Sequence, residues 1–559
     1  MKNLIGLFII VFLLAYCSPS TQKVEKDLSQ FIKKHQEIVE PLLRDANLAY
    51  WNASITGKKE DYDKFEKLQL KLVEIYSNKE DFEKLKKIKE SGKVKDPLLK
   101  RQLLILYNSY LENQVDKKLL KEIIKLSTTV EKQFNTFRGK IDGKEVTDNY
   151  IREILKTEIK DMEKRKKAWL ASKQVGKEVA NNLIKLVRLR NKAARSLGFD
   201  NYYTMALTLN EQSEEELVKI FEELRRLTDE PFRKLKDELD EALSNAYGIK
   251  KEDLRPWHYN DPFFQEGPTI GDINLDKYYK GKDIVKLAIK FYEGIGLPVN
   301  DIIQRSDLYE KKGKNPHAYT INIDRKGDVR ILANIKDTEQ WMETILHECG
   351  HGVYSKFVDQ NLPFFLRRYA HIFTTEAIAM FFGRLSRDPN WMRDMLNIDE
   401  SEIEKLKPAL RRSQKFKQLI FARWSQVMFN FERALYKNPD QDLNKLWWDL
   451  VEKYQYIHRP EGRDNPDWAA KIHFTSSPVY YHNYMLGELL ASQLHYYIAE
   501  NILHQDPTEV SYVNNKKIGE YIKERILKPG ARYRWNEMIE RATGEPLTAK
   551  YFVKQFVEN

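Results

Sequence analysis

Two histidines separated by three residues stand in the segment TILHECGHGVYSKF, residues 344–357. On an α-helix, His347 and His351 lie on one face a turn apart, so both imidazoles can reach a single cation. Glu348 is rotated by about 100° from His347 and can lie beside an open coordination position without binding the metal. Two neutral nitrogens and one carboxylate suit zinc and leave a fourth position for water. The segment therefore predicts a zinc site with a general base beside it.

A carboxylate further along the chain is needed as the third metal ligand. Asp359 is too close to the motif and falls in the turn DQNLP, which leaves Glu376 in FTTEAIAMFFGRL. Glu376 could instead interact with the N-terminus of its own apolar helix. We expect it to bind the metal, because the ion would otherwise be one ligand short. Cys349 points to another side of the helix and is expected to be a buried apolar side chain.

This set of residues suits metal-assisted hydrolysis of a peptide bond. Glu348 would take a proton from a zinc-bound water, which attacks the carbonyl carbon, and would pass that proton to the leaving amine. The oxyanion that develops needs a second stabilising group besides zinc. A tyrosine or histidine from a later helix would serve.

The elements around the motif are predicted to be mostly helical. Residues 22–245 form a succession of amphipathic patterns, and residues 254–274 are an irregular stretch rich in Pro, Gly and aromatic residues. Residues 317–335 alternate with period two around RKGD, which predicts a β-hairpin. Helices resume at Asp337, where Asp337 and Gln340 could form a capping box. We expect a mostly α, two-lobed peptidase body of the gluzincin type, with a deep central cleft and one small hairpin beside the zinc helix.

Composition supports a packed protein and argues against nucleic acid as a partner. Of 559 residues, 42% are hydrophobic and 12% aromatic, ample for a large core. The formal charge of +11 comes from 94 Lys and Arg against 83 Asp and Glu, interspersed as on exposed helix faces. No basic stripe with interleaved aromatics is present. Attraction to an anionic membrane surface is the more plausible use of the excess charge.

The N-terminus predicts export. The apolar run LIGLFIIVFLLAY would be roughly 20 Å long as a helix, too short for a hydrocarbon layer of about 30 Å. Residues 1–17 therefore predict a signal peptide. Cys17, three residues after Leu14, suits the lipidated cysteine of a bacterial lipoprotein, although Tyr16 fits that pattern poorly; the alternative is an ordinary cleaved signal. No later segment is long and apolar enough to span a membrane. The mature chain, 18–559, is expected to be one monomeric domain, with the zinc-site core at about 255–490.

With the zinc helix and Glu376 in place, the sequence resembles the angiotensin-converting-enzyme family of peptidyl-dipeptidases. The thimet-oligopeptidase-like family is the nearest competitor. HECGH and TEAIA look like the family's zinc signature and third-ligand segment. HAYTINIDRKGDVRIL is similar to the segment whose histidine, here His317, hydrogen-bonds the substrate backbone; Ala318 would line the peptide-binding strand. The resemblance implies that the hairpin edge holds the substrate as an added strand.

Two further segments carry implied roles. KIHFTSSP resembles the segment whose lysine, here Lys471, pairs with the substrate's C-terminal carboxylate, and whose histidine, here His473, contacts the carbonyl beside the cleaved bond. DPFFQ resembles the stretch whose glutamine, here Gln265, also holds that carboxylate. Tyr484 would stabilise the oxyanion, and Tyr481 would join Lys471. Alone, Lys471 could equally be a solvated surface lysine and His473 a core histidine.

The chain also departs from the family pattern. Tyr480 competes with Tyr481 because the tyrosine pair is displaced by one residue, and the spacing of Glu376 is nearer that of the oligopeptidases. Met380 replaces an aspartate that supports a zinc histidine, and Asn483 replaces the arginine associated with chloride activation. The resemblance implies release of C-terminal dipeptides from short peptides, with internal cleavage as the alternative. A surface lipoprotein that binds peptides without cleaving them is a third hypothesis, against which the intact Glu348 argues.

Overall fold

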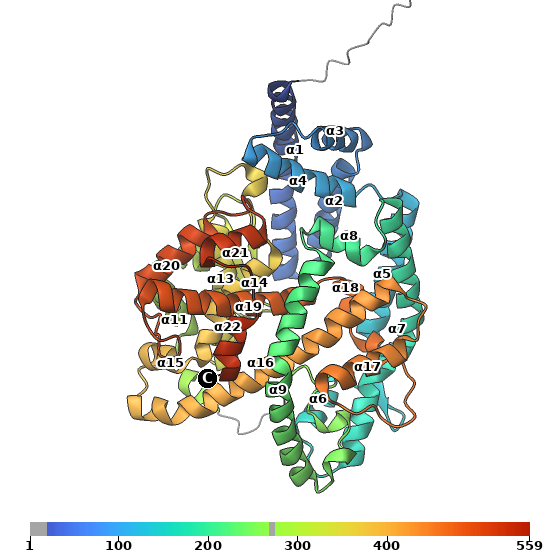
Figure 1. Ribbon diagram of the computed structural model, residues 1–559, viewed down its shortest axis with the longest axis vertical. Coiled ribbons are helices and arrows are strands. Elements are labelled where there is room, and N and C mark those ends of the chain that lie inside the picture. The colour runs from blue at the N-terminus through green and yellow to red at the C-terminus, as the bar shows by residue number, and fades with distance from the viewer. Residues whose placement is uncertain (1–19, 268–273, 559) are drawn as a thin grey trace, which may run out of the picture.

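The computed structural model describes residues 20–267 and 274–558, and it confirms the mostly α fold (Figure 1). The predicted signal peptide, including Cys17, lies outside the described residues. Within the described ranges, no helix combines the length and the apolar character that a membrane span requires. The described cysteine, Cys349, is buried, as expected for an apolar side chain.

Four helices pack together at the N-terminal end of the described chain, the blue part of Figure 1. Their apolar faces enclose a core of their own, into which Phe364 and Phe365 from a later segment also insert. Asp96 caps the fourth helix by accepting from the backbone N–H of Leu99 at 2.7 Å, and Pro97 occupies its first turn. The helices are α1 (Thr21–Thr56), α2 (Lys59–Tyr76), α3 (Lys79–Glu90) and α4 (Pro97–Glu112).

Five helices and a small hairpin follow. The sequence around α9 shows why its bounds fall where they do: Ser213 caps the first turn, which is acidic, and Gly248 ends the helix with φ of 66°. The hairpin was not predicted, since its strands are only three residues long. The elements are α5 (Lys117–Thr136), β1 (Gly139–Ile141), β2 (Lys144–Val146), α6 (Asp148–Thr157), α7 (Met162–Ser196), α8 (Tyr202–Leu209) and α9 (Glu214–Tyr247).

The predicted hairpin within residues 317–335 is confirmed. Strands β3 (Tyr319–Asn322) and β4 (Val329–Leu332) pair antiparallel, with Thr320 opposite Ile331. Helix α1 fixes the hairpin from one side, because Asn47 donates to the carbonyls of Asn322 and Ile323. Three short helices precede the strands: α10 (Asp276–Tyr279), α11 (Ile284–Gly294) and α12 (Asn300–Arg305).

The remaining chain is helical and begins with the helix that carries the histidine motif. The predicted capping box at Asp337 is wrong: Thr338 caps the helix by accepting from Trp341 N, while Asp337 accepts from Gly281 N. The helices are α13 (Glu339–Phe357), α14 (Ile372–Gly383), α15 (Pro389–Leu396), α16 (Glu400–Lys437), α17 (Leu443–Gln455), α18 (His473–Ser476), α19 (His482–Tyr497), α20 (Lys516–Ile522), α21 (Trp535–Thr543) and α22 (Lys550–Val553).

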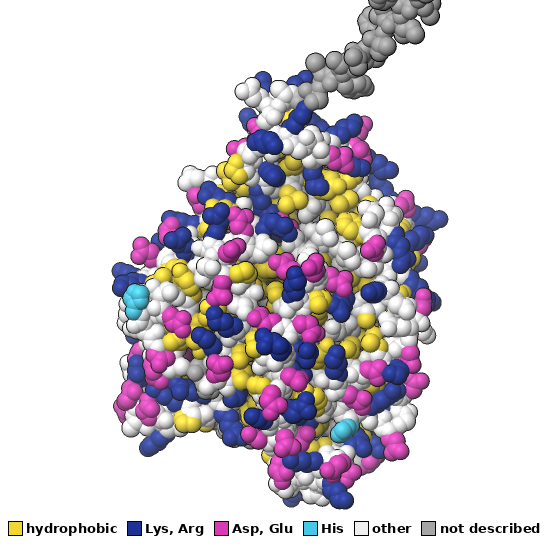
Figure 2. Space-filling model, viewed as in Figure 1, with side chains coloured by type: hydrophobic (Ala, Val, Ile, Leu, Met, Phe, Trp, Pro, Cys, Tyr) yellow, Lys and Arg dark blue, Asp and Glu magenta, His cyan; other side chains and the backbone are white. Residues whose placement is uncertain are grey.

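Two groups of helices flank the long helices α9 and α16 in Figure 1. Helices α13, α14 and α19 to α21 lie on one side, and α5, α7 and α17 lie on the other. Helix α16 contacts both groups, since it packs against α7 and α17 as well as α19. One continuous apolar core runs through both groups. On the face drawn in Figure 2, basic and acidic side chains are intermixed, as the sequence suggests for exposed helix faces.

Candidate metal centre

Close packing of α13, α14 and α19 builds the centre of the site. A Cβ atom on Gly350 of α13 would lie 2.7 Å from Ala379 Cα of α14, and one on Gly487 of α19 would lie 3.3 Å from Glu376 Cβ. Side chains at these two positions would push the helices apart. Glycine therefore allows the backbones to approach closely enough for Glu376 to face the two histidines of α13.

The three predicted metal ligands come together. Glu376 Oε2 lies 3.7 Å from His347 Nε2 and 3.8 Å from His351 Nε2. One ligand atom from each residue lies within 4.8 Å of the others, a spacing compatible with donors that each lie about 2 Å from a shared zinc ion. Burial lowers the pKa of His347 to about 4 and holds the pKa of His351 well below its ordinary value. Both imidazoles are therefore neutral at pH 7, as metal ligands must be.

Thr375 supports one of these histidines. Its hydroxyl lies 2.8 Å from His351 Nδ1. When Nδ1–H donates to this oxygen, Nε2 keeps its lone pair for a metal. The resemblance would assign this supporting role to an aspartate at the position of Met380, and Thr375 is placed to fill it. The sequence analysis missed Thr375, although it directly precedes Glu376.

Glu348 lies beside the three ligands and is held by the hairpin. Its side chain is only 7% exposed, and the Thr320 hydroxyl donates to its Oε2 at 2.7 Å. Burial raises the pKa of Glu348 to about 7, and the hydrogen bond from Thr320 opposes that shift. Thr320 was also missed, although it lies two residues after Ala318 and so on the same side of strand β3.

A cavity of about 730 Å³ opens over this centre. Its lining includes the two histidines, Glu348, Glu376 and five consecutive residues of the hairpin, Ala318 to Asn322. Within the described residues β3 pairs with β4 alone, so its other edge has no partner strand and an extended peptide could add there. His317 does not line the cavity: its side chain is exposed, and its backbone N–H donates to Asn315.

The residues predicted to hold a carboxylate line a second cavity of about 560 Å³. Gln265, Lys471, His473 and Tyr481 lie in its wall, although they come from distant parts of the sequence. Lys471 Nζ donates to Gln265 Oε1 at 2.5 Å. Met380 and Tyr484 line both cavities. The two cavities therefore meet beside the metal centre, at Met380 and Tyr484.

Lys471 is not a solvated surface lysine. It is 8% exposed, and its Nζ lies 5.1 Å from the ring centroid of Trp424, 5.3 Å from that of Phe263 and 5.5 Å from that of Tyr481. Burial lowers its pKa to about 8, and nearby Asp261 opposes the shift. The three aromatic rings stabilise the cation. The ammonium group still faces a cavity in which an anion could lie.

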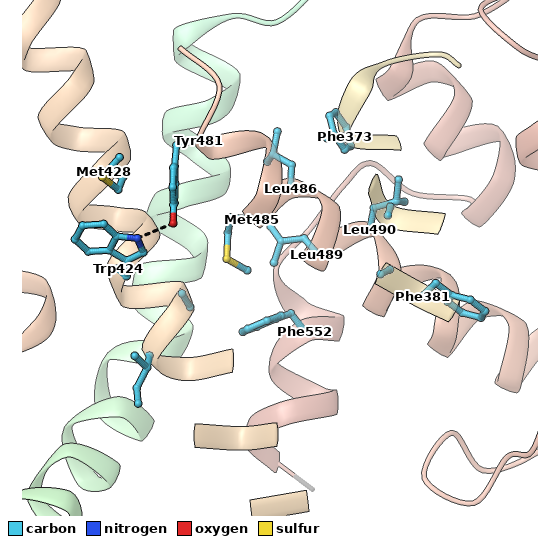
Figure 3. Close-up of a cluster of buried hydrophobic side chains, with 14 of the residues drawn as sticks. Phe373, Phe381, Trp424, Met428, Tyr481, Met485, Leu486, Leu489, Leu490 and Phe552 are labelled. Carbon is cyan, nitrogen blue, oxygen red and sulfur yellow. Dashed lines mark hydrogen bonds between the residues drawn. The ribbon is translucent and has the colours of Figure 1, made fainter. Parts of the chain in front are cut away.

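The three tyrosines take different positions. Tyr484 lines both main cavities, whereas Tyr480 lines a separate cavity of about 380 Å³ with Tyr369. Tyr481 lines the Lys471 cavity, but its hydroxyl accepts from Trp424 Nε1 at 2.7 Å (Figure 3). Of the three, only Tyr484 lines the metal cavity. The indole partner of Tyr481 was missed by the sequence analysis.

His473 lies beside Tyr481, with their ring centroids 4.9 Å apart. Its Nδ1 is buried and has no hydrogen-bond partner among the described residues. The residue is nevertheless only partly buried and lines the Lys471 cavity, so another part of its ring faces that space. The structure thus places His473 where a substrate could reach it.

Buried polar side chains hold the segment that carries His473 and the tyrosines. Arg190 of α7 donates to the carbonyls of Phe474 and Thr475, and Glu432 of α16 accepts from Val479 N at 2.8 Å. Val479 has φ of 56°, an unfavourable conformation for a β-branched residue. Arg190 and Glu432 therefore maintain a strained backbone directly before Tyr480.

Asn483 belongs to a hydrogen-bond network of uncharged side chains. Its Oδ1 accepts from Gln212 Nε2 at 3.0 Å, and Gln212 Oε1 lies 2.9 Å from His482 Nε2. An amide partner therefore satisfies Asn483 where the family's arginine would bring a positive charge.

The fold and the site define a helical metallopeptidase with an HExxH zinc motif. The model of peptidase family M3 matches residues 155–558, and the angiotensin-converting enzyme model matches residues 22–258. The chain belongs to peptidase family M3. The predicted resemblance to the angiotensin-converting-enzyme family, with the oligopeptidase family as its neighbour, is confirmed, because each family model matches a part of the chain.

Individual relatives come from both groups. Angiotensin-converting enzyme-like protein Ace3 of Mus musculus is 24% identical over 441 residues, which cover 73% of this chain and 59% of that protein. Oligoendopeptidase F homolog of Borreliella burgdorferi is 22% identical over 580 residues, 96% of this chain and 90% of that protein. Thermostable carboxypeptidase 1 of Pyrococcus furiosus is 22% identical over 403 residues, 66% of this chain and 72% of that protein. The chain thus spans less than two thirds of Ace3, and the names of the relatives describe different peptidase activities.

Proposed function

We propose that this protein is a zinc-dependent peptidase that hydrolyses short peptides. The observation that carries the proposal is the convergence of His347, His351 and Glu376 in a cavity that also holds Glu348. The donor set fits zinc, since it offers two neutral imidazoles and one carboxylate. When bound, zinc would acidify a water molecule and polarise the substrate carbonyl.

The protein's own residues would move the protons and orient the substrate. Glu348 accepts a proton from the attacking water and returns it to the leaving amine, while Thr320 keeps the carboxylate oriented. Tyr484 lies where the two cavities meet and can donate to the developing oxyanion. His473 can contact the neighbouring carbonyl.

The substrate would lie along the free edge of β3, with its C-terminus in the second cavity. Lys471 and Gln265 offer an ammonium and an amide to a terminal carboxylate, which favours the release of C-terminal dipeptides. The specific alternative is an oligoendopeptidase, supported by the similarity of nearly the whole chain to an oligoendopeptidase F homolog. A lipoprotein that binds peptides without cleaving them is the remaining hypothesis.

We also propose that the protein is exported as a bacterial lipoprotein, anchored to a membrane through Cys17 and otherwise monomeric. The support is the sequence alone, in the short apolar run followed by cysteine. Mass spectrometry of the mature N-terminus tests the anchor. A lipid-modified Cys17 supports it, and an unmodified N-terminus generated by simple cleavage contradicts it.

One assay separates the functional alternatives. Zinc-loaded protein is incubated with matched peptides whose C-termini are free or amidated, with and without a chelator, and with Glu348→Gln as the inactive control. Release of dipeptides from free C-termini alone, abolished by the chelator, supports the proposal. Internal cleavage of amidated peptides supports the oligoendopeptidase. Absence of cleavage by zinc-loaded protein contradicts both and favours the binding role.

A further inference from the structure

The cavity over the metal centre contains a basic region. This region is separate from the Lys471 cavity. Arg325, Arg367 and Arg368 line it. Among the described residues, the lining of the metal cavity holds two carboxylates, Glu348 and Glu376, and both belong to the metal centre itself. None of the three arginines lines the second cavity, where Lys471 and Gln265 lie. The arginines and Lys471 therefore occupy different parts of the combined cleft.

Two of the arginines have no carboxylate partner within the described parts of the chain. The Arg325 guanidinium lies 5.0 Å from the ring centroid of Phe364, and that of Arg368 lies 5.6 Å from the ring centroid of Tyr369. Burial, and to a lesser extent the nearby charge of Arg368, lowers the pKa of Arg325 to about 10. The Arg325 side chain therefore stays charged at pH 7. Two like charges held close together without a counter-ion suit the binding of an anionic group.

The hairpin turn distinguishes Arg325 from the basic residue that follows it. Arg325 has φ of 57°, the left-handed conformation, and its backbone N–H donates to Asn322 Oδ1 at 2.9 Å. Lys326 instead lines another cavity, where it forms an ion pair with Glu40 of α1. The fold thus neutralises Lys326 internally and leaves the neighbouring Arg325 available in the metal cavity.

We propose that Arg325 and Arg368 bind an acidic side chain of the substrate on the N-terminal side of the cleaved bond. The direction rests on the proposed function, in which Lys471 and Gln265 hold the C-terminus. Thr320 contacts Glu348, and Asn322 lies about 7 Å further along the strand, with Arg325 in the turn beyond it. The arginines then face substrate residues about three or four positions before the cleaved bond. Peptides with Glu or Asp there are the preferred substrates.

The test uses matched peptides that differ only in carrying Glu, Gln or Lys at each of the five positions before the cleaved bond. For the zinc-loaded wild type we expect kcat/KM to be about tenfold higher with Glu than with Gln at one of these positions, because a charge-assisted pair replaces a neutral contact. Arg325→Gln and Arg368→Gln should each reduce that ratio. The double variant Arg325→Glu/Arg368→Glu should prefer Lys.

Lys326→Gln is the matched control, since it removes a basic residue of the same turn that is already paired with Glu40. It should keep the wild-type ratio. Equal rates for Glu and Gln peptides in an active wild type overturn the inference and leave the proposed function intact. A loss of activity in Arg325→Gln that affects free C-termini and spares amidated ones also overturns it, because the arginines would then hold the terminal carboxylate.

If no peptide is hydrolysed, binding measurements test the preference for an acidic side chain. Calorimetry with zinc-loaded Glu348→Gln protein then compares the affinities of the Glu and Gln peptides. Tighter binding of the Glu peptide, lost in Arg325→Gln, supports the acidic preference although the peptidase proposal has failed. Equal affinities overturn the inference as well.

Discussion

The metal centre and the Lys471 cavity meet at Tyr484 but are assembled differently. Both histidines come from α13 and Glu376 comes from the next helix, which packs directly on α13. Lys471 and Gln265, by contrast, are joined by a hydrogen bond across more than 200 residues of sequence (|i−j| = 206). Helix spacing fixes the two histidines and the packing of the next helix adds Glu376, whereas the second group comes together through tertiary packing of distant segments. Changes at the metal centre should therefore affect the reaction itself, and changes around Lys471 should affect which peptides bind.

The largest effect is expected at Glu348. Glu348→Gln keeps the size of the side chain and removes the base, so we expect kcat to fall by about 10²–10⁴-fold. Zinc content should not change, since Glu348 is not among the three clustered ligands. Steady-state kinetics and elemental analysis on the same preparation check both points. A variant that keeps wild-type kcat would remove Glu348 from the mechanism.

The second-largest effect is expected at Thr375, which supports the metal ligand His351. Thr375→Val preserves shape and removes the oxygen that lies 2.8 Å from His351 Nδ1. Loss of such a partner typically weakens metal affinity by about 10- to 100-fold. A competition titration with a zinc chelator measures the change. Unaltered affinity would show that Thr375 does not orient the ligand.

Lys471→Met should affect binding selectively. We expect KM to rise about tenfold for peptides with a free C-terminus and to stay constant for amidated peptides, because one charge-assisted contact is lost. Lys417→Met is the control: Lys417 lines the same cavity, but Glu343 lies 3.6 Å from its ammonium group. Equal effects of Lys471→Met on both peptide types would mean that the lysine serves the fold alone.

The smallest effect is expected on the pH dependence of stability. It concerns Glu432, which holds the backbone at Val479 just before the tyrosines. Burial raises the pKa of Glu432 to about 8, although the hydrogen bond from Val479 opposes the shift. The folded state then binds a proton that the unfolded state has released, so this group lowers the free energy of unfolding as pH rises from about 4.5 to 8. Glu432→Gln can still accept from Val479 and should gain stability relative to wild type across that range.

Chemical denaturation of both proteins at pH 5 and pH 8 measures the difference. The advantage of Glu432→Gln should be small at pH 5 and larger at pH 8. An advantage that does not change with pH would show that the carboxyl group titrates alike in the folded and unfolded states.

Local patterns could be predicted from the sequence, and partners across the fold could not. The hairpin follows from period-two alternation and the histidine pair from helical spacing, and both depend on neighbouring residues alone. Thr320, Thr375 and Trp424 gain their significance from contacts with Glu348, His351 and Tyr481, which only packing creates. The start of α13 is a further example, since Thr338 caps the helix while Asp337 accepts from Gly281, a residue far away in the sequence.

The assignment of the tyrosines illustrates the same limit. Tyr480, Tyr481 and Tyr484 have equal chemistry, and a displacement of one residue in the pattern leaves their roles open. The structure separates them because Val479 takes a left-handed conformation and turns the chain before α19 begins. No local pattern in the sequence predicts that turn, since a β-branched residue is unfavourable there.

The central claim is that His347, His351 and Glu376 bind one zinc ion. X-ray absorption at the zinc edge, with zinc stoichiometry, tests it directly on the wild type and on Glu376→Ala. We expect one zinc per chain with two imidazole nitrogens at about 2.0–2.1 Å, and a large loss of zinc affinity in the variant. A variant that keeps wild-type affinity and an unaltered absorption spectrum would contradict it.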